Sequence, residues 1–195
     1  MKCVLLFTER NQSVMKFAYA DPPYLGCGSL YDEHHPDARD WDRVRTHHSL
    51  IKRLCDEYSD GWVMSLSSPS LREILPLCPR DCRVGAWVKP FASFKPNVNP
   101  AYAWEPVIFL GGRKGDRSRL TVRDWFSKEI TLKKGLCGAK PAAFCGWVLE
   151  LLGFDPKQDT LEDLFPGTGI MGEVLAGRRC DPSTTPMFAD ISGDV

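Results

Sequence analysis

Short apolar runs alternate along this chain with longer stretches of helical periodicity, and this alternation restricts the folds that the chain can adopt. Strands that alternate with helices are typical of an α/β protein, in which a mostly parallel sheet carries helices on both faces. We therefore expect one sheet of this kind. The expected strands are 2–7, 15–20, 61–67, 83–88, 105–110 and 160–164, and the expected helices are 42–58, 70–77, 142–152 and 170–176.

The composition is that of a globular protein. The chain has 195 residues, of which 43% are hydrophobic and 26% are charged, and it can bury a substantial core. No apolar run approaches the ~20 residues of a membrane span, and the run 3–7 is too short for a signal peptide. We therefore expect a cytoplasmic protein without membrane contact. We also expect a single domain over 1–181, followed by a C-terminal loop or disordered tail over 182–195.

The most specific motif is Asp21-Pro22-Pro23-Tyr24, which directly follows the apolar run 15–20. Proline fixes its own backbone angle and pushes the preceding residue into an extended conformation. The Asp21 carboxylate and the Pro22 carbonyl are then fixed in space, and both can accept hydrogen bonds from one exocyclic amine. Tyr24 offers a ring face on which a base can stack. The alternative is a strand end followed by a turn that the prolines stiffen.

This motif resembles the Asp-Pro-Pro-Tyr motif of the S-adenosylmethionine-dependent amino-methyltransferases that modify adenine in DNA. A second segment, at the end of the expected strand 160–164, is similar to the cofactor loop of that family. It contains an acid, an aromatic residue and two glycines, which are Asp163, Phe165, Gly167 and Gly169. Glycines let the backbone approach a ligand closely, and a helix that follows directs its N-terminal amides at the same ligand. The resemblance implies that these four residues bind S-adenosylmethionine.

A third segment, Lys140-Pro141, opens the expected helix 142–152. In the permuted members of the family a Lys-Pro pair begins a helix that precedes the cofactor loop and contacts the methionine end of the cofactor. The resemblance therefore implies that Lys140 pairs with the cofactor carboxylate. An ordinary helix start with proline in its first turn would have the same sequence, so both interpretations stay open.

The order of the two loops indicates a circular permutation. In the unpermuted arrangement the glycine loop precedes Asp-Pro-Pro-Tyr, whereas here it follows by more than a hundred residues. The chemistry needs both loops at the carboxyl ends of neighbouring parallel strands. We therefore predict that the strand ending at Asp163 lies beside the strand ending at Ala20. The implied fold is a circularly permuted, Rossmann-like methyltransferase fold.

The cofactor half of this fold is expected to be truncated. Only 26 residues follow Gly169, whereas a full cofactor half has two more strands with a helix between them. One of those strands usually ends in an acid that binds the cofactor ribose, and Asp181 is the candidate here. The strand 2–7 fills one missing place in one interpretation. In the other, a partner subunit or a second copy of the chain completes the pocket.

Positive charge is concentrated in one run, although the net charge of the chain is zero. Phosphate contacts dominate nucleic-acid affinity and come mainly from Arg and Lys. The predicted nucleic-acid contacts are Arg113, Lys114, Arg117 and Arg119 in this run, and Lys95 in the aromatic-rich stretch 90–104. Aromatic residues in that stretch suit base stacking around an extruded nucleotide. The alternatives are a solvated loop for the basic run and, for 90–104, a proline-rich loop whose aromatics pack under the sheet.

No metal site is expected. The chain has eight cysteines, but Cys78 and Cys82 lack the second pair that a tetrahedral zinc site needs. His34 and His35 stand together in the long loop 25–40, but no third ligand is evident. Because this loop follows Tyr24 directly, we interpret it as a lid or a base-recognition loop.

The resemblance implies a DNA adenine methyltransferase in which S-adenosylmethionine is the methyl donor. Acceptors on Asp21 and Pro22 would expose the lone pair of the adenine amine for in-line displacement, on a base flipped out of the duplex. RNA adenine or the amine of cytosine in DNA is an alternative target. Cytosine enzymes of this type tend towards Ser at the position of Asp21, and glutamine-methylating enzymes resemble Asn-Pro-Pro-Tyr, so Asp21 favours adenine. The alternative from another class is a catalytically silent nucleic-acid-binding subunit.

Overall fold

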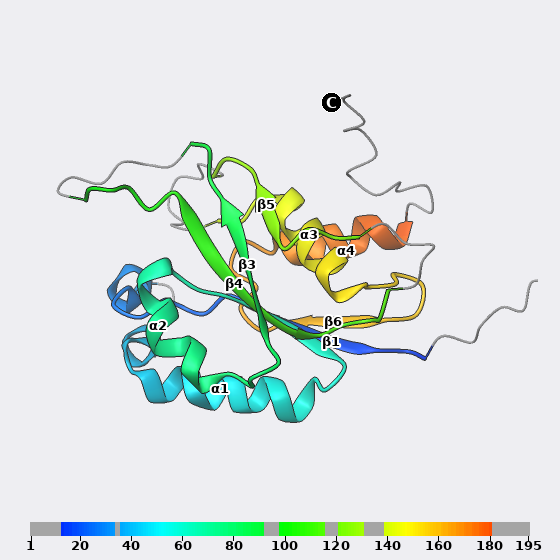
Figure 1. Cartoon of the computed structure of the whole chain (residues 1–195), viewed down its shortest axis with the longest axis horizontal. Helices are drawn as coiled ribbons and strands as arrows, with labels where there is room; N and C mark the ends of the chain where they lie inside the picture. Colours follow the sequence, from blue (N-terminus) through cyan, green and yellow to red (C-terminus); the bar gives the residue numbers. More distant parts are fainter. Residues whose placement is uncertain (1–12, 34–35, 92–97, 116–120, 131–138, 181–195) are drawn as a thin grey trace, which may run out of the picture.

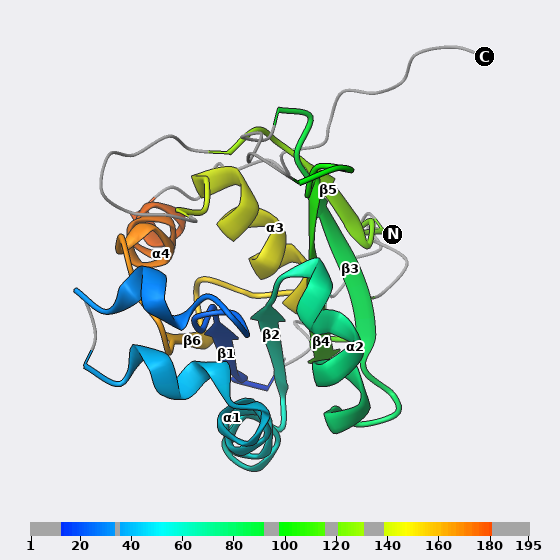
Figure 2. The same cartoon turned by 90° about the vertical axis from the view of Figure 1, so that its left-hand side faces the viewer.

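The computed structural model describes residues 13–33, 36–91, 98–115, 121–130 and 139–180. Within these ranges the chain forms one six-stranded sheet. Figures 1 and 2 show helices on both faces of this sheet. The strands are β1 (Lys16–Ala20), β2 (Gly61–Ser65), β3 (Arg83–Val88), β4 (Trp104–Gly111), β5 (Trp125–Ser127) and β6 (Thr160–Asp163). The α-helices are α1 (Val44–Glu57), α2 (Leu71–Ile74), α3 (Ala142–Leu152) and α4 (Ile170–Cys180).

The strands follow the order β5-β3-β4-β2-β1-β6 across the sheet. Strand β1 runs parallel to β2 and to β6, and β5 runs parallel to β3, whereas β4 is antiparallel to both of its neighbours. The mostly parallel α/β sheet expected from the sequence is therefore confirmed. The predicted neighbourhood of the strands that end at Ala20 and Asp163 is confirmed as well, because Tyr19 pairs with Asp163 across β1 and β6.

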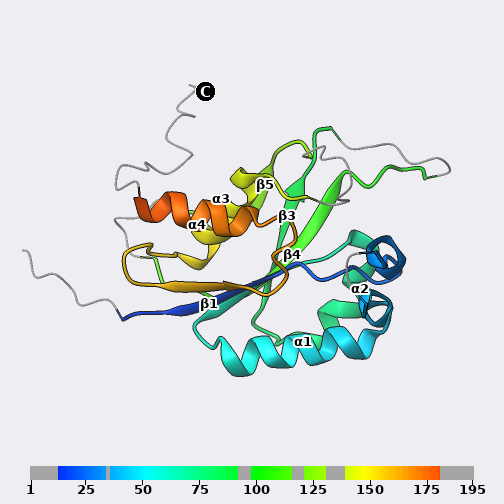
Figure 3. The ribbon, with the colours of Figure 1, turned by 180° about the vertical axis from the view of Figure 1, so that it is seen from behind.

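The core has two halves, one on each face of the sheet, because successive strand residues point to opposite faces. Phe17 and Tyr19 of β1 pack with α3 and α4, whereas Ala18 and Ala20 pack with α1. Helix α3 is apolar almost throughout and lies on the first face, and amphipathic α1 covers the second (Figure 3). Because β1 is buried on both faces, its position in the sheet is fixed, and so is the position of Asp21, which directly follows it.

Several elements differ from the expected ones in their extent. The expected helix 70–77 is instead a series of short helices: η3 (Ser68–Ser70), α2 and η4 (Leu75–Leu77). Pro76 interrupts the helix after α2, because proline lacks the amide hydrogen that a continuous helix needs. Strand β5 was not expected, since three residues carry too little periodicity to identify a strand. The expected strand 2–7 and the tail 182–195 lie outside the described residues.

An ion pair fixes the end of the sheet at which β1 and β6 begin. Arg113, just after β4, donates to both carboxylate oxygens of Asp159, at 2.6 and 2.8 Å. The Asp159 side chain is fully buried and also accepts the backbone amide hydrogens of Met15 and Asp155. One carboxylate thereby joins the end of β4 to the starts of β1 and β6.

Among the described residues, the helices are too short or too polar to cross a bilayer.

Replacing Asp159 by Asn should destabilise the protein by about 3 kcal/mol, because the charge of Arg113 would be left buried without its counter-ion. Urea denaturation of the two proteins measures this difference. Asp32→Asn is the matched control, since Asp32 pairs with Arg39 at an exposed site, where an ion pair contributes roughly 1 kcal/mol or less. Equal losses in the two variants would contradict the structural role of Asp159.

Candidate active site

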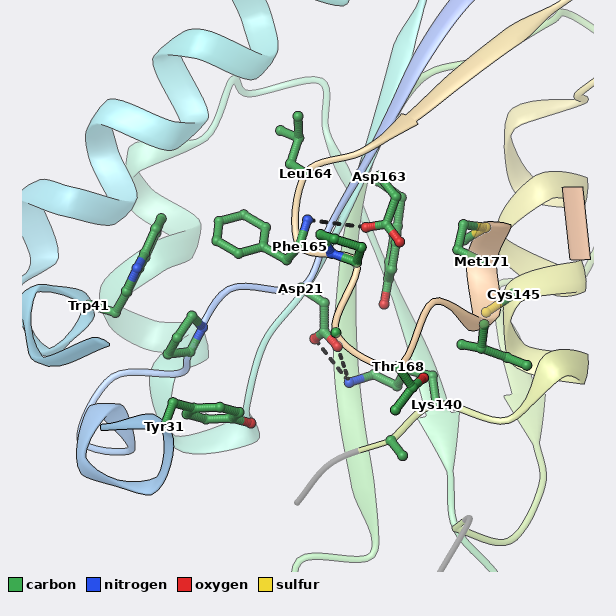
Figure 4. A pocket seen from close by; sticks show the side chains of 16 residues that line it. Asp21, Tyr31, Trp41, Lys140, Cys145, Asp163, Leu164, Phe165, Thr168 and Met171 are labelled. Carbon is green, nitrogen blue, oxygen red and sulfur yellow. Dashed lines mark hydrogen bonds and ion pairs between the residues drawn. The ribbon is translucent and has the colours of Figure 1, made fainter. Parts of the chain in front are cut away.

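A pocket of about 500 Å³ lies where β1 and β6 end, as Figure 4 shows. Asp21 is the first residue after β1, and Asp163 is the last residue of β6. Open α/β sheets bind ligands at the carboxyl ends of adjacent parallel strands. The remaining walls come from the loop after β6, the first turn of α4, the start of α3, and Tyr31 and Trp41 from the loop that follows β1.

Asp21 is held from two directions. The ammonium group of Lys140 donates to both of its carboxylate oxygens, at 2.9 and 2.8 Å. The Tyr24 hydroxyl lies 3.1 Å from Asp21 Oδ1 and accepts a hydrogen bond from Lys140 at 3.0 Å. Lys140 directly precedes Pro141, the extended N-cap residue of α3, so the start of this helix places it here. The side chains of Asp21 and Lys140 are only 22% and 6% exposed.

A second acid belongs to the same cluster, although the sequence analysis gave it no role. Glu105, near the start of β4, lies 2.9 Å from the Tyr24 hydroxyl and 3.5 Å from Lys140 Nζ. Its other carboxylate oxygen pairs with Lys89, which directly follows β3. The cluster therefore contains two acids and two lysines around one tyrosine hydroxyl, with no net charge.

Burial and charge act against each other in this cluster. Burial raises the pKa of Asp21, and Lys140 only partly offsets that effect. Burial alone would lower the pKa of Lys140, but Asp21 and Glu105 raise it, so the ammonium group stays charged. Burial also acts to raise the pKa of Glu105, but Lys140 and Lys89 outweigh it and lower that pKa. Burial raises the pKa of Tyr24 well above its usual value.

The loop after β6 forms the other side of the pocket. The backbone amide of Phe165 donates to Asp163 Oδ1 at 3.1 Å, which closes a tight turn. Gly167 and Gly169 have φ angles of +46° and +77°, in the left-handed region that favours glycine. A Cβ at Gly169 would meet no atom within 4 Å, and a Cβ at Gly167 would meet only the Phe165 carbonyl at 3.8 Å. The backbone of this loop is thus open to a ligand.

Aromatic side chains line one end of the pocket. Tyr31 ends η1 (Gly28–Tyr31), and Trp41 lies in η2 (Ala38–Asp42). Trp41 packs edge-on against Phe165, with ring centroids 5.0 Å apart. The loop 25–40 was expected from the sequence, but a role for Tyr31 or Trp41 was not. Their positions depend on two short 3-10 helices, which leave no periodic pattern in the sequence.

The predicted nucleic-acid contacts are not all near this pocket. Arg113 is held by Asp159, and exposed Lys114 follows it, at the end of the sheet opposite Asp21. Because β4 is antiparallel to β2, its last residues lie far from the end at which Glu105 contacts Tyr24. Lys95, Arg117, Arg119 and Asp181 lie outside the described residues, as do His34 and His35.

The cysteines do not form a metal site within the described ranges. No group of three or more His, Cys, Asp or Glu side chains in these ranges is arranged to hold a metal ion. Cys145 on α3 lines the pocket, and burial raises the pKa of its thiol to about 12. A thiol with such a pKa is not a nucleophile at neutral pH. Cys55, Cys78, Cys82 and Cys145 form no disulfide bonds.

Asp163 should make folding pH-dependent. Burial raises its pKa to about 6, whereas an unfolded aspartate has a pKa of about 3.9. The folded protein therefore retains a proton that the unfolded chain loses, and this contribution to stability disappears as pH rises from about 4 to about 6. Asp163→Asn cannot titrate, so the melting temperature of the variant minus that of the native protein should increase between pH 4 and pH 7. A difference independent of pH would contradict the burial of this carboxyl group.

Comparisons with known proteins identify the fold. No protein-family model matches the chain, and no curated protein matches its sequence. Among solved structures, the complex of M1.HpyAVI with S-adenosylmethionine matches with a TM-score of 0.53 and 15% identity, over 85% of this chain and 79% of that chain. A structure of M1.HpyAVI itself gives a TM-score of 0.52 and 15% identity, over 85% and 78% of the two chains. The chain therefore has the Rossmann-like methyltransferase fold.

Proposed function

We propose that this protein is an S-adenosylmethionine-dependent DNA methyltransferase that methylates the exocyclic amine of adenine. One observation carries the proposal: the Asp21–Tyr24 motif and the glycine loop of residues 167–169 meet in one pocket, at the carboxyl ends of adjacent parallel strands. The fold supports it, since a solved structure of this fold contains S-adenosylmethionine. The permuted order of the two motifs does not prevent their meeting.

The residues of the pocket fit this cofactor. The glycine loop offers open backbone, and Lys140 supplies a cation for a carboxylate group. Tyr31, Trp41 and Phe165 form an aromatic wall for a purine ring. The volume of about 500 Å³ is in the range of small-molecule sites. When bound, S-adenosylmethionine supplies a methyl group on a positively charged sulfur.

The chemical task of Asp21 is to orient the target amine. A carboxylate has about four acceptor positions, and Lys140 and Tyr24 do not use all of them. The adenine amine is a weak nucleophile because its lone pair is delocalised into the ring. Hydrogen bonds from this amine to Asp21 and to the Pro22 carbonyl would hold it in place and expose the lone pair. The proton that leaves the amine after methylation can pass to Asp21 or to water.

Contact with nucleic acid is proposed at the segments that flank residues 92–97. Phe91, Tyr102 and Trp104 are 54%, 51% and 38% exposed there. Trp104 precedes Glu105, so these aromatics lie at the same end of the sheet as Asp21. Exposed aromatic side chains stack on unpaired bases, and a base must leave the duplex before its amine can react. This surface suits an extruded nucleotide better than Lys114 does, at the opposite end.

Methyl transfer tests the proposal directly. The full-length protein is incubated with labelled S-adenosylmethionine and separate pools of DNA and RNA, and the digested nucleosides are identified by mass spectrometry. We expect methylated adenosine from the DNA pool. Label on RNA adenine or on cytosine would correct the target, and no label with retained DNA binding would favour a silent subunit.

Asp21→Asn should reduce methyl transfer by at least about a hundredfold, because a positioned carboxylate contributes on the order of 10²–10⁴ to such reactions. Asp32→Asn, on the exposed surface, is the control and should retain activity. Initial rates at saturating cofactor give the comparison. If Asp21→Asn turned over like the control, the carboxylate would have no part in the reaction.

Gly167→Val should weaken cofactor binding by at least about tenfold, because the new side chain would enter the pocket and strain a left-handed backbone. Titration calorimetry with S-adenosylmethionine measures the affinity. Gly167→Asn separates the two effects, since Asn tolerates this backbone region. Gly115→Val, at an open site, is the control. Unchanged affinity in Gly167→Val would place the cofactor elsewhere.

A further inference from the structure

Glu105 and Lys89 are buried charges for which the proposed reaction has no direct use. Their side chains are 13% and 11% exposed, and they come from β4 and from the residue after β3. Burying a charge is unfavourable unless it is paired and hydrogen-bonded. A cross-strand ion pair at an exposed edge would avoid that cost. Their burial beside Asp21 therefore calls for an explanation in terms of the site.

Glu105 contacts both of the groups that hold Asp21. Its Oε2 atom lies 2.9 Å from the Tyr24 hydroxyl and 3.5 Å from Lys140 Nζ. The same hydroxyl lies 3.1 Å from Asp21 Oδ1, and the same ammonium group lies 2.8 Å from Asp21 Oδ2. The Tyr24 hydroxyl and the Lys140 ammonium group thus each lie between the carboxylates of Asp21 and Glu105. Lys89 balances the charge of Glu105 from the far side.

The Tyr24 hydroxyl has a single hydrogen, so it can donate fully to only one acid at a time. Donation to Glu105, the nearer acceptor, leaves Asp21 Oδ1 with an acceptor position for an incoming amine. Without Glu105, the Tyr24 hydroxyl would donate to Asp21 as well as Lys140 does, and the two donors would mask the carboxylate. The second acid therefore determines how much of Asp21 is free for the target.

We propose that Glu105, with Lys89 as its counter-ion, is a positioning residue that keeps Asp21 available by accepting the Tyr24 hydroxyl hydrogen. Glu105 touches neither substrate nor cofactor in this scheme and acts only through the Tyr24 hydroxyl and through its charge beside Lys140. The availability of Asp21 to an amine rests on the proposed function. The arrangement of charges around Asp21 does not, so it can be tested on the free protein.

The titration of Asp21 reports this arrangement. The negative charge of Glu105 contributes to the raised pKa of Asp21, after burial and against Lys140. Glu105→Gln should therefore lower the pKa of Asp21, whereas Lys89→Met should raise it, since the charge of Glu105 then loses its counter-ion. The groups that face Asp21 or its lysine are Tyr19 and Tyr24 on its own segment, Tyr31 from η1, Lys140 just before α3, Cys145 from α3, Glu105 from β4 and Asp163 from β6.

The test is a pH titration of the side-chain carboxyl groups of the full-length protein by ¹³C NMR, with Asp21→Asn used to assign the Asp21 signal. We expect the midpoint of Asp21 to fall in Glu105→Gln and to rise in Lys89→Met. The double variant should follow Glu105→Gln, because Lys89 acts through Glu105. Lys89→Arg keeps the charge and should restore the native midpoint. Glu57→Gln, in an exposed pair on α1, is the control.

An unchanged Asp21 midpoint in Glu105→Gln, or shifts of the same sign in both single variants, would overturn the proposal. Lys89→Met gives an independent reading should Glu105→Gln fold poorly. In the methylation assay, Glu105→Gln should lower kcat/KM by at least about tenfold through misplacement of Asp21. If the Asp21 midpoint fell in Glu105→Gln and rose in Lys89→Met but no methylation was found, the proposed function would be wrong. The proposed arrangement of charges around Asp21 would still be supported. If the protein methylated DNA but the Asp21 midpoint did not change in these variants, only the proposed role of Glu105 would be wrong.

Discussion

The architecture of the site depends on the ion pair between Lys140 and Asp21, which lie 119 positions apart in the chain. A buried ammonium group is unfavourable unless carboxylates surround it. This requirement fixes the start of α3 against the end of β1. Two lysines and two acids make the cluster neutral, so the charge of Glu105 is balanced by Lys89 as well as by Lys140. The electrostatics of Asp21 is therefore a property of four segments together.

The parallel pairing of β1 with β6 brings the two signature loops together. Because Tyr19 pairs with Asp163, the residues that follow each strand emerge side by side at one edge of the sheet. Adjacency in the sheet, and not order along the chain, is what a site of this kind requires. Helix α3 then covers the same edge from one face, so that a single pocket contains polar groups at its centre and aromatic groups at one end.

Local chemistry explains how much of this arrangement could be predicted from the sequence. The resemblance of Asp21–Tyr24 and of the glycine loop to two motifs of one family, together with the parallel-strand rule, was enough to predict that β1 and β6 are neighbours. The partner of Lys140 could not be predicted in this way, because a side-chain contact across 119 positions leaves no local pattern. The direction of β4 was equally hidden, and an antiparallel β4 moves Lys114 to the end of the sheet opposite Asp21.

Lys140 therefore has two roles in the proposed reaction, and they compete. The resemblance to permuted methyltransferases implies that it pairs with the carboxylate of the cofactor, whereas in this structure it pairs with Asp21. The Lys140 ammonium group has three hydrogens. It can bind two carboxylates at once only if these hydrogens are shared between them. Lys140 Nζ lies 2.8 Å from Asp21 and 3.5 Å from Glu105, so when it turns to the cofactor carboxylate it releases acceptor positions on Asp21. In this scheme, cofactor binding and the release of Asp21 for the target amine are one electrostatic event.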